Sequence, residues 1–255
     1  MSEDLQDKKT GLALGGGAVL GAAHIGILKA LGEYEISVDH IAGTSIGAFI
    51  ASLYAFGVGP DEIERIASGL DWLEISKISL RGPGLLSNEA FGAIIRERIG
   101  EVDMEDARIP ISIITADIAN GEKVVISRGK VAQAVMASTA IPGIYEPVEI
   151  ENRFLVDGGM IENVPVQAVR ELGADFIMGV DLNASHAFRR PENILEVLLN
   201  SLHLAIISAS RLREEEADFM IIPDLSAFNI FDTEQVPDLI RKGYEEGKRI
   251  LKELV

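Results

Sequence analysis

The sequence predicts a layered α/β fold in which a central, mostly parallel sheet is flanked by helices. The 255 residues are 47% hydrophobic and include 25 glycines, which provides enough apolar material for one sizeable core. Short apolar runs alternate with longer segments of helical periodicity, a pattern typical of strands that are covered on both faces. Two strand-to-helix junctions are rich in glycine. We therefore expect a single domain over 1–255, with the polar residues 1–9 flexible.

The first half of the chain carries the clearer pattern of elements. We expect strands over 9–14, 36–44, 109–117 and 123–126, and helices over 22–31, 45–56, 60–68, 88–99 and 130–138. The helix at 60 starts with Pro-Asp-Glu, which is favoured in a first turn. Asn120-Gly121 favours a tight turn that joins two of the strands as a hairpin. The stretch Leu70 to Ser87 combines apolar residues with Gly-Pro breakers, and we expect it to form a mobile cover; the alternative is that its apolar side chains close the core.

In the second half, polar turns separate short apolar runs. We expect strands over 148–150, 154–156, 175–182 and 218–222, and helices over 194–213 and 235–254. The last helix has an amphipathic pattern, so one face of it should pack against the core. Nothing in the sequence indicates a repeat or a linker.

The formal net charge of −17 excludes some partner classes. Nucleic-acid binding depends on Lys and Arg, so a nucleic-acid partner is not expected. The same charge weakens docking on strongly anionic membranes, and no apolar run reaches spanning length. The absence of cysteine and of a His-x-x-x-His pair disfavours a metal site. Residues 1–9 lack the apolar region of a secretory signal, so we expect a cytoplasmic protein with at most peripheral membrane contact.

A Gly-x-Ser-x-Gly pentapeptide, Gly43 to Gly47, stands where a predicted strand meets a predicted helix. A sharp strand-to-helix turn needs small residues on both sides of its central residue. The turn places the Ser45 hydroxyl at a helix N-terminus, where backbone amides favour developing negative charge. The spacing therefore predicts that Ser45 is a nucleophile.

A second glycine-rich turn, Gly15 to Gly21, follows the first predicted strand. Such turns expose backbone N–H groups that bind phosphates or oxyanions. A dinucleotide site is disfavoured because Ala18 or Leu20 interrupts the required Gly-x-Gly-x-x-Gly spacing. A Walker A loop is disfavoured because this turn lacks the Lys that such a loop requires. An oxyanion site and a purely structural tight turn are the interpretations that fit.

An acidic residue, Asp157, ends a predicted strand and is followed by Gly158 and Gly159. The ends of strands are where α/β sheets place functional side chains. The competing interpretation is an ordinary Asx turn, which an Asp-Gly pair commonly forms. A carboxylate within hydrogen-bond reach of a serine can accept its proton, so Asp157 is a candidate base.

Four segments together resemble the bacterial and archaeal branch of the patatin-like phospholipase family. They are Gly15 to Gly26, Gly43 to Gly47, Ala140 to Gly143, and Asp157 to Pro165. They occur in the order that the family has. The resemblance implies a patatin-like layered fold and hydrolysis of acyl esters in lipids or lysophospholipids, without a cofactor.

The resemblance also implies roles for single residues. Ser45 and Asp157 would form a catalytic dyad, and the amides around Gly16, Gly17 and Ala18 would form the oxyanion hole. The supporting motif residues are Gly15, Gly21, Gly43, Gly47, Gly158 and Gly159. The chain departs from the family at Leu20, where Arg or Lys is usual, so a cationic grip on a charged head group is not expected from this position.

Two alternatives stay open from the sequence. A Ser-His-Asp esterase would use His186 or His203 as the third member of a triad, because both follow Ser45 and Asp157 in the chain. Neither histidine lies on a clear turn. The other alternative is a non-catalytic lipid-binding regulatory module, against which the presence of Ser45, Asp157 and the glycines argues.

Overall fold

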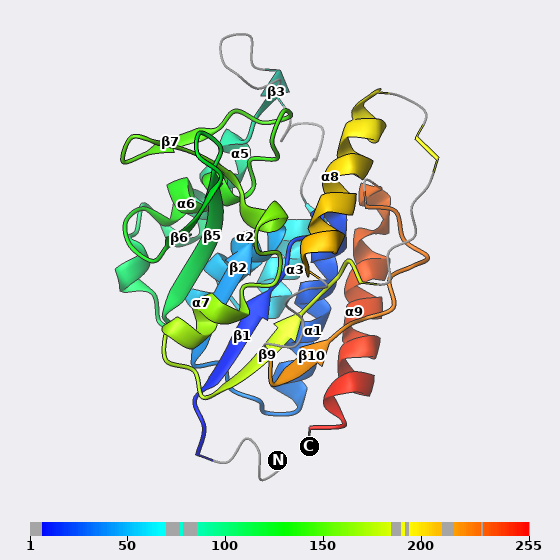
Figure 1. The fold of residues 1–255 in the computed structure, drawn as a ribbon. Coiled ribbons are helices and arrows are strands. Elements are labelled where there is room, and N and C mark those ends of the chain that lie inside the picture. Colours follow the sequence, from blue (N-terminus) through cyan, green and yellow to red (C-terminus); the bar gives the residue numbers. More distant parts are fainter. Residues whose placement is uncertain are drawn as a thin grey trace.

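The computed structural model describes residues 7–69, 77–78, 86–184, 190–191, 194–210, 217–230 and 232–254. An eight-stranded sheet with the order β10-β9-β1-β2-β5-β8-β7 lies at its centre, and β6 pairs with β5 outside this path (Figure 1). The strands are β1 (Thr10–Leu14), β2 (His40–Thr44), β5 (Ile111–Asp117), β6 (Glu122–Ile126), β7 (Val148–Ile150), β8 (Arg153–Asp157), β9 (Phe176–Val180) and β10 (Phe219–Ile221). Strands β10, β9, β1, β2 and β5 are parallel, whereas β6 and β8 run antiparallel to β5. This confirms the predicted α/β class with its mostly parallel sheet.

Helices cover both faces of the sheet. The larger core lies between the first face of the sheet and six helices, which are α1 (Ala22–Glu33), α2 (Ile46–Ala55), α3 (Pro60–Ser68), α5 (Glu89–Ile99), α6 (Val131–Ser138) and α9 (Val236–Leu251). The second face packs α7 (Val166–Glu171), which lies across the strands in Figure 1. Successive side chains of a strand point to opposite faces, so Leu12 and Leu14 of β1 enter the first core and Ala13 enters the second. The small alanine allows α7 to lie close to the sheet.

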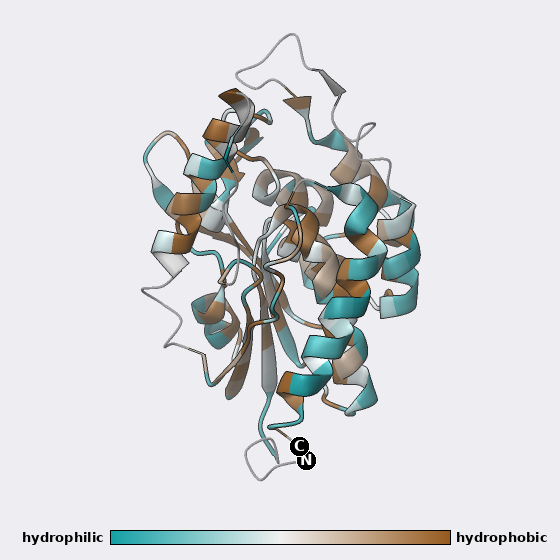
Figure 2. Ribbon diagram, turned by 90° about the vertical axis from the view of Figure 1, so that its right-hand side faces the viewer, coloured by the Kyte–Doolittle hydropathy of each residue, from teal (hydrophilic) through white to brown (hydrophobic). Residues whose placement is uncertain are grey.

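The C-terminal helix α9 closes the first core against α1. It is amphipathic, with hydrophilic and hydrophobic residues alternating along it in Figure 2. Two glycines lie where the helices cross: a Cβ on Gly26 would sit 2.1 Å from the Ile240 carbonyl oxygen, and one on Gly243 would sit 2.2 Å from that of Ala23. A side chain at either position would collide with the backbone of the other helix, so the close crossing of α1 and α9 requires glycine at these two positions.

Most predicted elements are present within two residues of the expected ends. One helix, α7, was not predicted; its six residues are too few to show a helical period. Of the predicted cover Leu70 to Ser87, the structure describes only β3 (Lys77–Ile78) and β4 (Leu86–Ser87), which pair antiparallel. The rest of that stretch lies outside the described residues, as do 1–6 and 211–213, so those predictions stay predictions. None of the helices built from described residues is long and apolar enough to cross a bilayer.

Candidate active site

Strand β5 brings Ser45 and Asp157 together. β2 pairs with the first half of β5, ending at Thr44 opposite Ile114, and β8 pairs with the second half, ending at Asp157 opposite Thr115. β6 pairs with β5 over both halves, so it occupies the other edge. β2 and β8 therefore share one edge of β5 and meet end to end, which sets the residue after Thr44 beside Asp157.

The turn at Ser45 is strained and tightly packed. Ser45 has φ 56° and ψ −128°, a left-handed conformation that costs a non-glycine residue on the order of 1–3 kcal/mol. A Cβ on Gly43 would lie 2.5 Å from the Ala48 nitrogen, and one on Gly47 would lie 2.2 Å from the Leu14 carbonyl oxygen. The glycines that flank the serine are thus required by close backbone contacts, as the pentapeptide predicts.

A buried serine holds this turn in place. The Ser45 amide donates to Ser138 Oγ at 2.8 Å, and Ser138 Oγ donates to the Ile114 carbonyl at 2.7 Å. Ser138, at the end of α6, is fully buried. These two hydrogen bonds link the strained turn to β5, so they fix the Ser45 backbone just before α2 begins at Ile46.

Asp157 is a buried carboxylate beside two groups that interact with it. The Gly159 amide donates to Asp157 Oδ1 at 2.8 Å, and the Ser45 side chain lies close enough to interact with the same carboxylate. Burial raises the pKa of Asp157 from 3.8 to about 6, although the interactions with Ser45 and Gly159 oppose the rise. The carboxylate is thus a stronger base than an exposed aspartate and is still ionised at neutral pH.

The glycine-rich loop lies directly against Ser45. A Cβ on Gly16 would sit 3.1 Å from Ser45 Cβ. The Gly16 amide donates to Asn163 Oδ1 at 3.1 Å, and the Gly16 carbonyl accepts from Asn183 Nδ2 at 2.8 Å. Within the described part of the chain, the amides of Gly17 and Ala18 have no acceptor. These two N–H groups are therefore available to a ligand.

The remaining motif glycines lie around this centre. Gly15 donates its amide to the Val180 carbonyl at 3.1 Å, Gly21 ends the 3₁₀ helix η1 (Ala18–Gly21), and Gly158 and Gly159 open the 3₁₀ helix η3 (Gly158–Met160). The structure thus collects all of the predicted motif residues at one end of the parallel strands.

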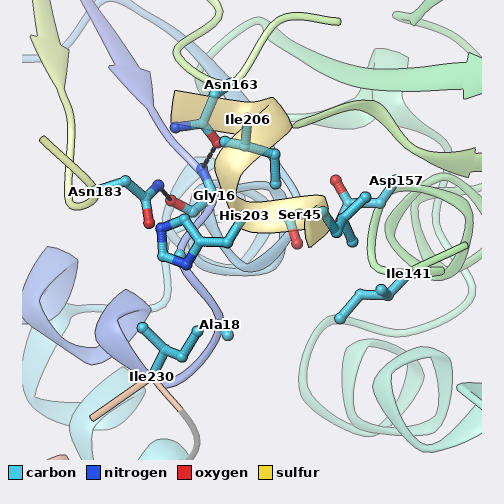
Figure 3. A pocket seen from close by; sticks show the side chains of 12 residues that line it. Gly16, Ala18, Ser45, Ile141, Asp157, Asn163, Asn183, His203, Ile206 and Ile230 are labelled. Carbon is cyan, nitrogen blue, oxygen red and sulfur yellow. Dashed lines mark hydrogen bonds between the residues drawn. The ribbon is translucent and has the colours of Figure 1, made fainter. Parts of the chain in front are cut away.

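A pocket opens above the serine (Figure 3). It is lined by Gly16, Gly17, Ala18, Ser45, Ile141, Asp157, Asn163, Asn183, Leu202, His203, Ile206 and Ile230. Polar groups cluster at the Ser45 end. Isoleucine and leucine side chains supply much of the remaining wall, partly from α8 (Ile194–Ser210). The pocket therefore combines a polar reaction centre with an apolar surface that suits an acyl chain.

His203 lies in this pocket, whereas His186 lies outside the described residues. A triad would place an imidazole between serine and carboxylate. Here the Ser45 side chain lies close enough to interact with Asp157 directly, and His203 is a wall residue of the pocket. Among the described residues, no group of three or more His, Asp or Glu side chains is arranged to hold a metal ion.

Leu20, where the chain departs from the family pattern, lies away from the pocket. Its side chain is completely buried in the larger core and does not line the pocket. A cation at this position in the present backbone would be buried among apolar groups, where a charge is costly. Leu20 therefore makes no contact with the pocket, which agrees with the expectation that this position offers no grip on a charged head group.

Sequence reasoning missed Asn163, Asn183 and Ser138. Asn163 lies inside the Asp157 to Pro165 segment, and its place in this family-like segment was the available hint that it belongs to the site. Asn183 and Ser138 stand after a strand and at a helix end without a motif of their own. Their roles depend on contacts with residues far away in the sequence.

Comparisons with known proteins show which family the chain is similar to. The family model described as patatin-like phospholipase matches residues 12–170. An uncharacterized NTE family protein of Mycobacterium tuberculosis is 35% identical over 182 residues, which are 70% of this chain and 50% of that protein. Lysophospholipase NTE1 of Coccidioides immitis is 27% identical over 288 residues, covering 100% of this chain and 18% of that protein. The chain thus spans about half the length of the mycobacterial relative.

Solved structures share the fold at low sequence identity. VipD from Legionella pneumophila superposes with a TM-score of 0.67 and 16% identity, covering 97% of this chain and 67% of that one. The type III effector ExoU gives a TM-score of 0.56 and 18% identity, covering 96% and 53%. At these identities the likeness concerns the fold alone.

Proposed function

The chain belongs to the patatin-like phospholipase family, and from that membership we propose that it is a serine hydrolase of lipid acyl esters, lysophospholipids among them. The observation that carries the proposal is that Ser45 and the buried Asp157 carboxylate line one pocket and lie close enough for their side chains to interact. The same pocket also offers amides without an acceptor among the described residues and an apolar wall.

In the proposed reaction, Ser45 Oγ attacks the acyl carbonyl carbon while Asp157 takes the hydroxyl proton. The carbonyl oxygen becomes an oxyanion. Collapse of the tetrahedral intermediate breaks the ester bond, and Asp157 returns the proton to the departing alcohol. A water molecule then attacks the Ser45 acyl ester, giving its proton to Asp157, and the acid leaves as Ser45 regains its hydrogen.

The proposed oxyanion hole uses the amides of Gly17 and Ala18. Neither has an acceptor among the described residues, and both line the pocket. The Gly16 amide donates to Asn163, so in this conformation it is not a donor of the proposed oxyanion hole. Losing one donor of such a hole typically costs about 100- to 1,000-fold in kcat.

We also propose that α8 contacts lipid aggregates. Its pocket-lining residues Leu202 and Ile206 belong to the same helix as the exposed apolar side chains of Ile194, Val197, Leu198 and Leu204. Ile194 is 88% exposed, and Figure 2 shows hydrophobic residues along this helix. An apolar surface beside a lipid pocket would allow a substrate to pass from a micelle without crossing bulk water.

The test combines turnover with covalent labelling. Purified protein should hydrolyse p-nitrophenyl butyrate and lysophosphatidylcholine, and a fluorophosphonate probe should label it at one site that peptide mapping assigns to Ser45. Denatured protein is the control for labelling. Binding of lysophosphatidylcholine without turnover or labelling would instead support the regulatory module.

The raised pKa of Asp157 predicts the pH dependence of the reaction. Only the ionised carboxylate can accept the serine proton, so kcat/KM for p-nitrophenyl butyrate should be flat above about pH 6 and fall about tenfold per pH unit below it. The rate is measured from pH 4.5 to 8, with circular dichroism to verify folding. His203→Gln serves as the control, because its profile should keep the same midpoint; a midpoint that disappears with His203 would assign the titration to the histidine.

A further inference from the structure

Two successive peptide groups of the glycine-rich loop are held by side chains. In the 15–16 peptide, the Gly15 carbonyl accepts from His24 Nε2 at 2.7 Å, and the Gly16 amide donates to Asn163 Oδ1 at 3.1 Å. In the 16–17 peptide, the Gly16 carbonyl accepts from Asn183 Nδ2 at 2.8 Å. Asn163 and Asn183 both reach Gly16 in Figure 3. Each hydrogen bond fixes the rotation of one peptide plane.

The planar trans peptide converts these contacts into a direction for the next amide. The carbonyl oxygen and the N–H of one peptide point to opposite sides, and the described residues contain no cis peptide bond. The Gly16 carbonyl faces Asn183, so the Gly17 N–H is turned away from Asn183. That N–H is one of the two that have no acceptor within the described chain.

We propose that Asn183 is the positioning residue of the oxyanion hole, acting through the Gly16 carbonyl to aim the Gly17 N–H at the reacting oxygen, with Asn163 and His24 fixing the preceding peptide. The inference rests on the proposed hydrolase function. It assigns a role to three buried polar residues that do not take part in proton transfer.

Asn183 is itself held firmly. The residue is 3% exposed, and its backbone amide donates to Asp181 Oδ1 at 2.7 Å. Asp181 directly follows β9, and its amide donates to the Ile221 carbonyl at 3.1 Å. The donor that orients the loop is therefore anchored to the sheet on the β9 side, whereas Asn163 approaches from the turn that follows η3.

For the two partners of the 15–16 peptide, the hydrogen bonds show which atom donates and which accepts. The Gly16 N–H can only meet an acceptor, so the near atom of the Asn163 amide is its oxygen. Burial lowers the pKa of His24 to about 4, against the hydrogen bond to Gly15 that raises it, so the imidazole is neutral at pH 7. Because a carbonyl oxygen can only accept a hydrogen bond, His24 Nε2 must be the donor, and the proton of this neutral ring lies on Nε2.

The experiment uses Asn183→Leu, which has a similar volume and no donor, and Asn183→Asp, whose carboxylate repels the Gly16 carbonyl. Both should lower kcat/KM for p-nitrophenyl butyrate by about 100-fold, with KM within threefold. A trifluoromethyl ketone, which forms a tetrahedral oxyanion adduct on a serine, should lose affinity by the same factor. Rates are expressed per site labelled by fluorophosphonate.

The matched control is Asn88→Leu. Asn88 is also a buried asparagine that donates to a backbone carbonyl, that of Met136, but it does not line the pocket. It should lower the thermal midpoint while kcat/KM and ketone affinity per labelled site stay within threefold of the parent. A purely structural role for Asn183 would give that same pattern and would overturn the inference.

The outcomes separate this inference from the proposed function. A parent protein without turnover and without labelling contradicts the hydrolase itself. An active parent with an Asn183→Leu variant inside threefold contradicts only the positioning role. A rate loss without a parallel loss of ketone affinity also contradicts it, because the oxyanion contact would then be unchanged.

Discussion

Replacing Ser45 with alanine should lower kcat for p-nitrophenyl butyrate by a factor on the order of 10⁵ or more, to the background of the assay. The hydroxyl is the only group proposed to form the acyl-enzyme, so no residual covalent route exists without it. The variant should also fail to react with a fluorophosphonate. Steady-state kinetics and intact-protein mass spectrometry measure the two effects.

The same position offers a control for folding. Alanine keeps the unfavourable φ of 56°, so Ser45→Ala should melt near the parent temperature. Ser45→Gly also lacks the nucleophile but relieves the strain, and it should melt higher, with a gain of about 1 kcal/mol or more. Both variants should be equally inactive. Fluorophosphonate labelling that persists in either variant would show that the nucleophile is another residue.

Replacing Asp157 with asparagine should lower kcat by roughly 10⁴-fold and leave KM near the parent value. The neutral amide occupies the same space but cannot accept the Ser45 proton. His203→Ala is the comparison, expected to stay within about tenfold of the parent. A loss of three orders of magnitude in His203→Ala would support the triad and contradict the dyad.

The same substitution should stabilise the fold. The pKa of Asp157 is about 6 in the folded protein against 3.8 as its ordinary value, so the folded state disfavours the charged form. The buried charge lowers the free energy of unfolding. This loss is absent below about pH 4, grows between pH 4 and 6, and is complete above pH 6, where it amounts to about 3 kcal/mol. Asp157→Asn should therefore unfold at higher denaturant concentration than the parent at pH 8, and this advantage should shrink toward pH 4.5.

The sequence predicted the elements well because the parallel strands are short, mostly apolar runs between polar turns. It could not predict that β2 and β8 meet end to end along β5, because that arrangement depends on which edge β6 takes. Glycine spacing pointed to Ser45 and the place at a strand end pointed to Asp157, and the family resemblance implied that the two act as a dyad.

The residues around the glycine-rich loop were harder to predict. Asn183 is 167 positions away from Gly16, and Asn163 is 147 away, so no local pattern connects them. The inward turn of Leu20 was missed for a related reason: a 3₁₀ helix decides which side chain points to the core, and four residues are too short to reveal that period.

The central place of β1 in the sheet has a consequence for biosynthesis. Thr10 leaves the ribosome early, but its partner Phe176 in β9 is made much later, which at about 5–20 residues per second is a delay of roughly 10–30 s. During that interval one edge of β1 has no native neighbour, and it can pair with the same strand of another nascent chain. We expect the yield of folded protein to depend on translation rate and on chaperones that bind the nascent chain, more than on the stability of the finished molecule.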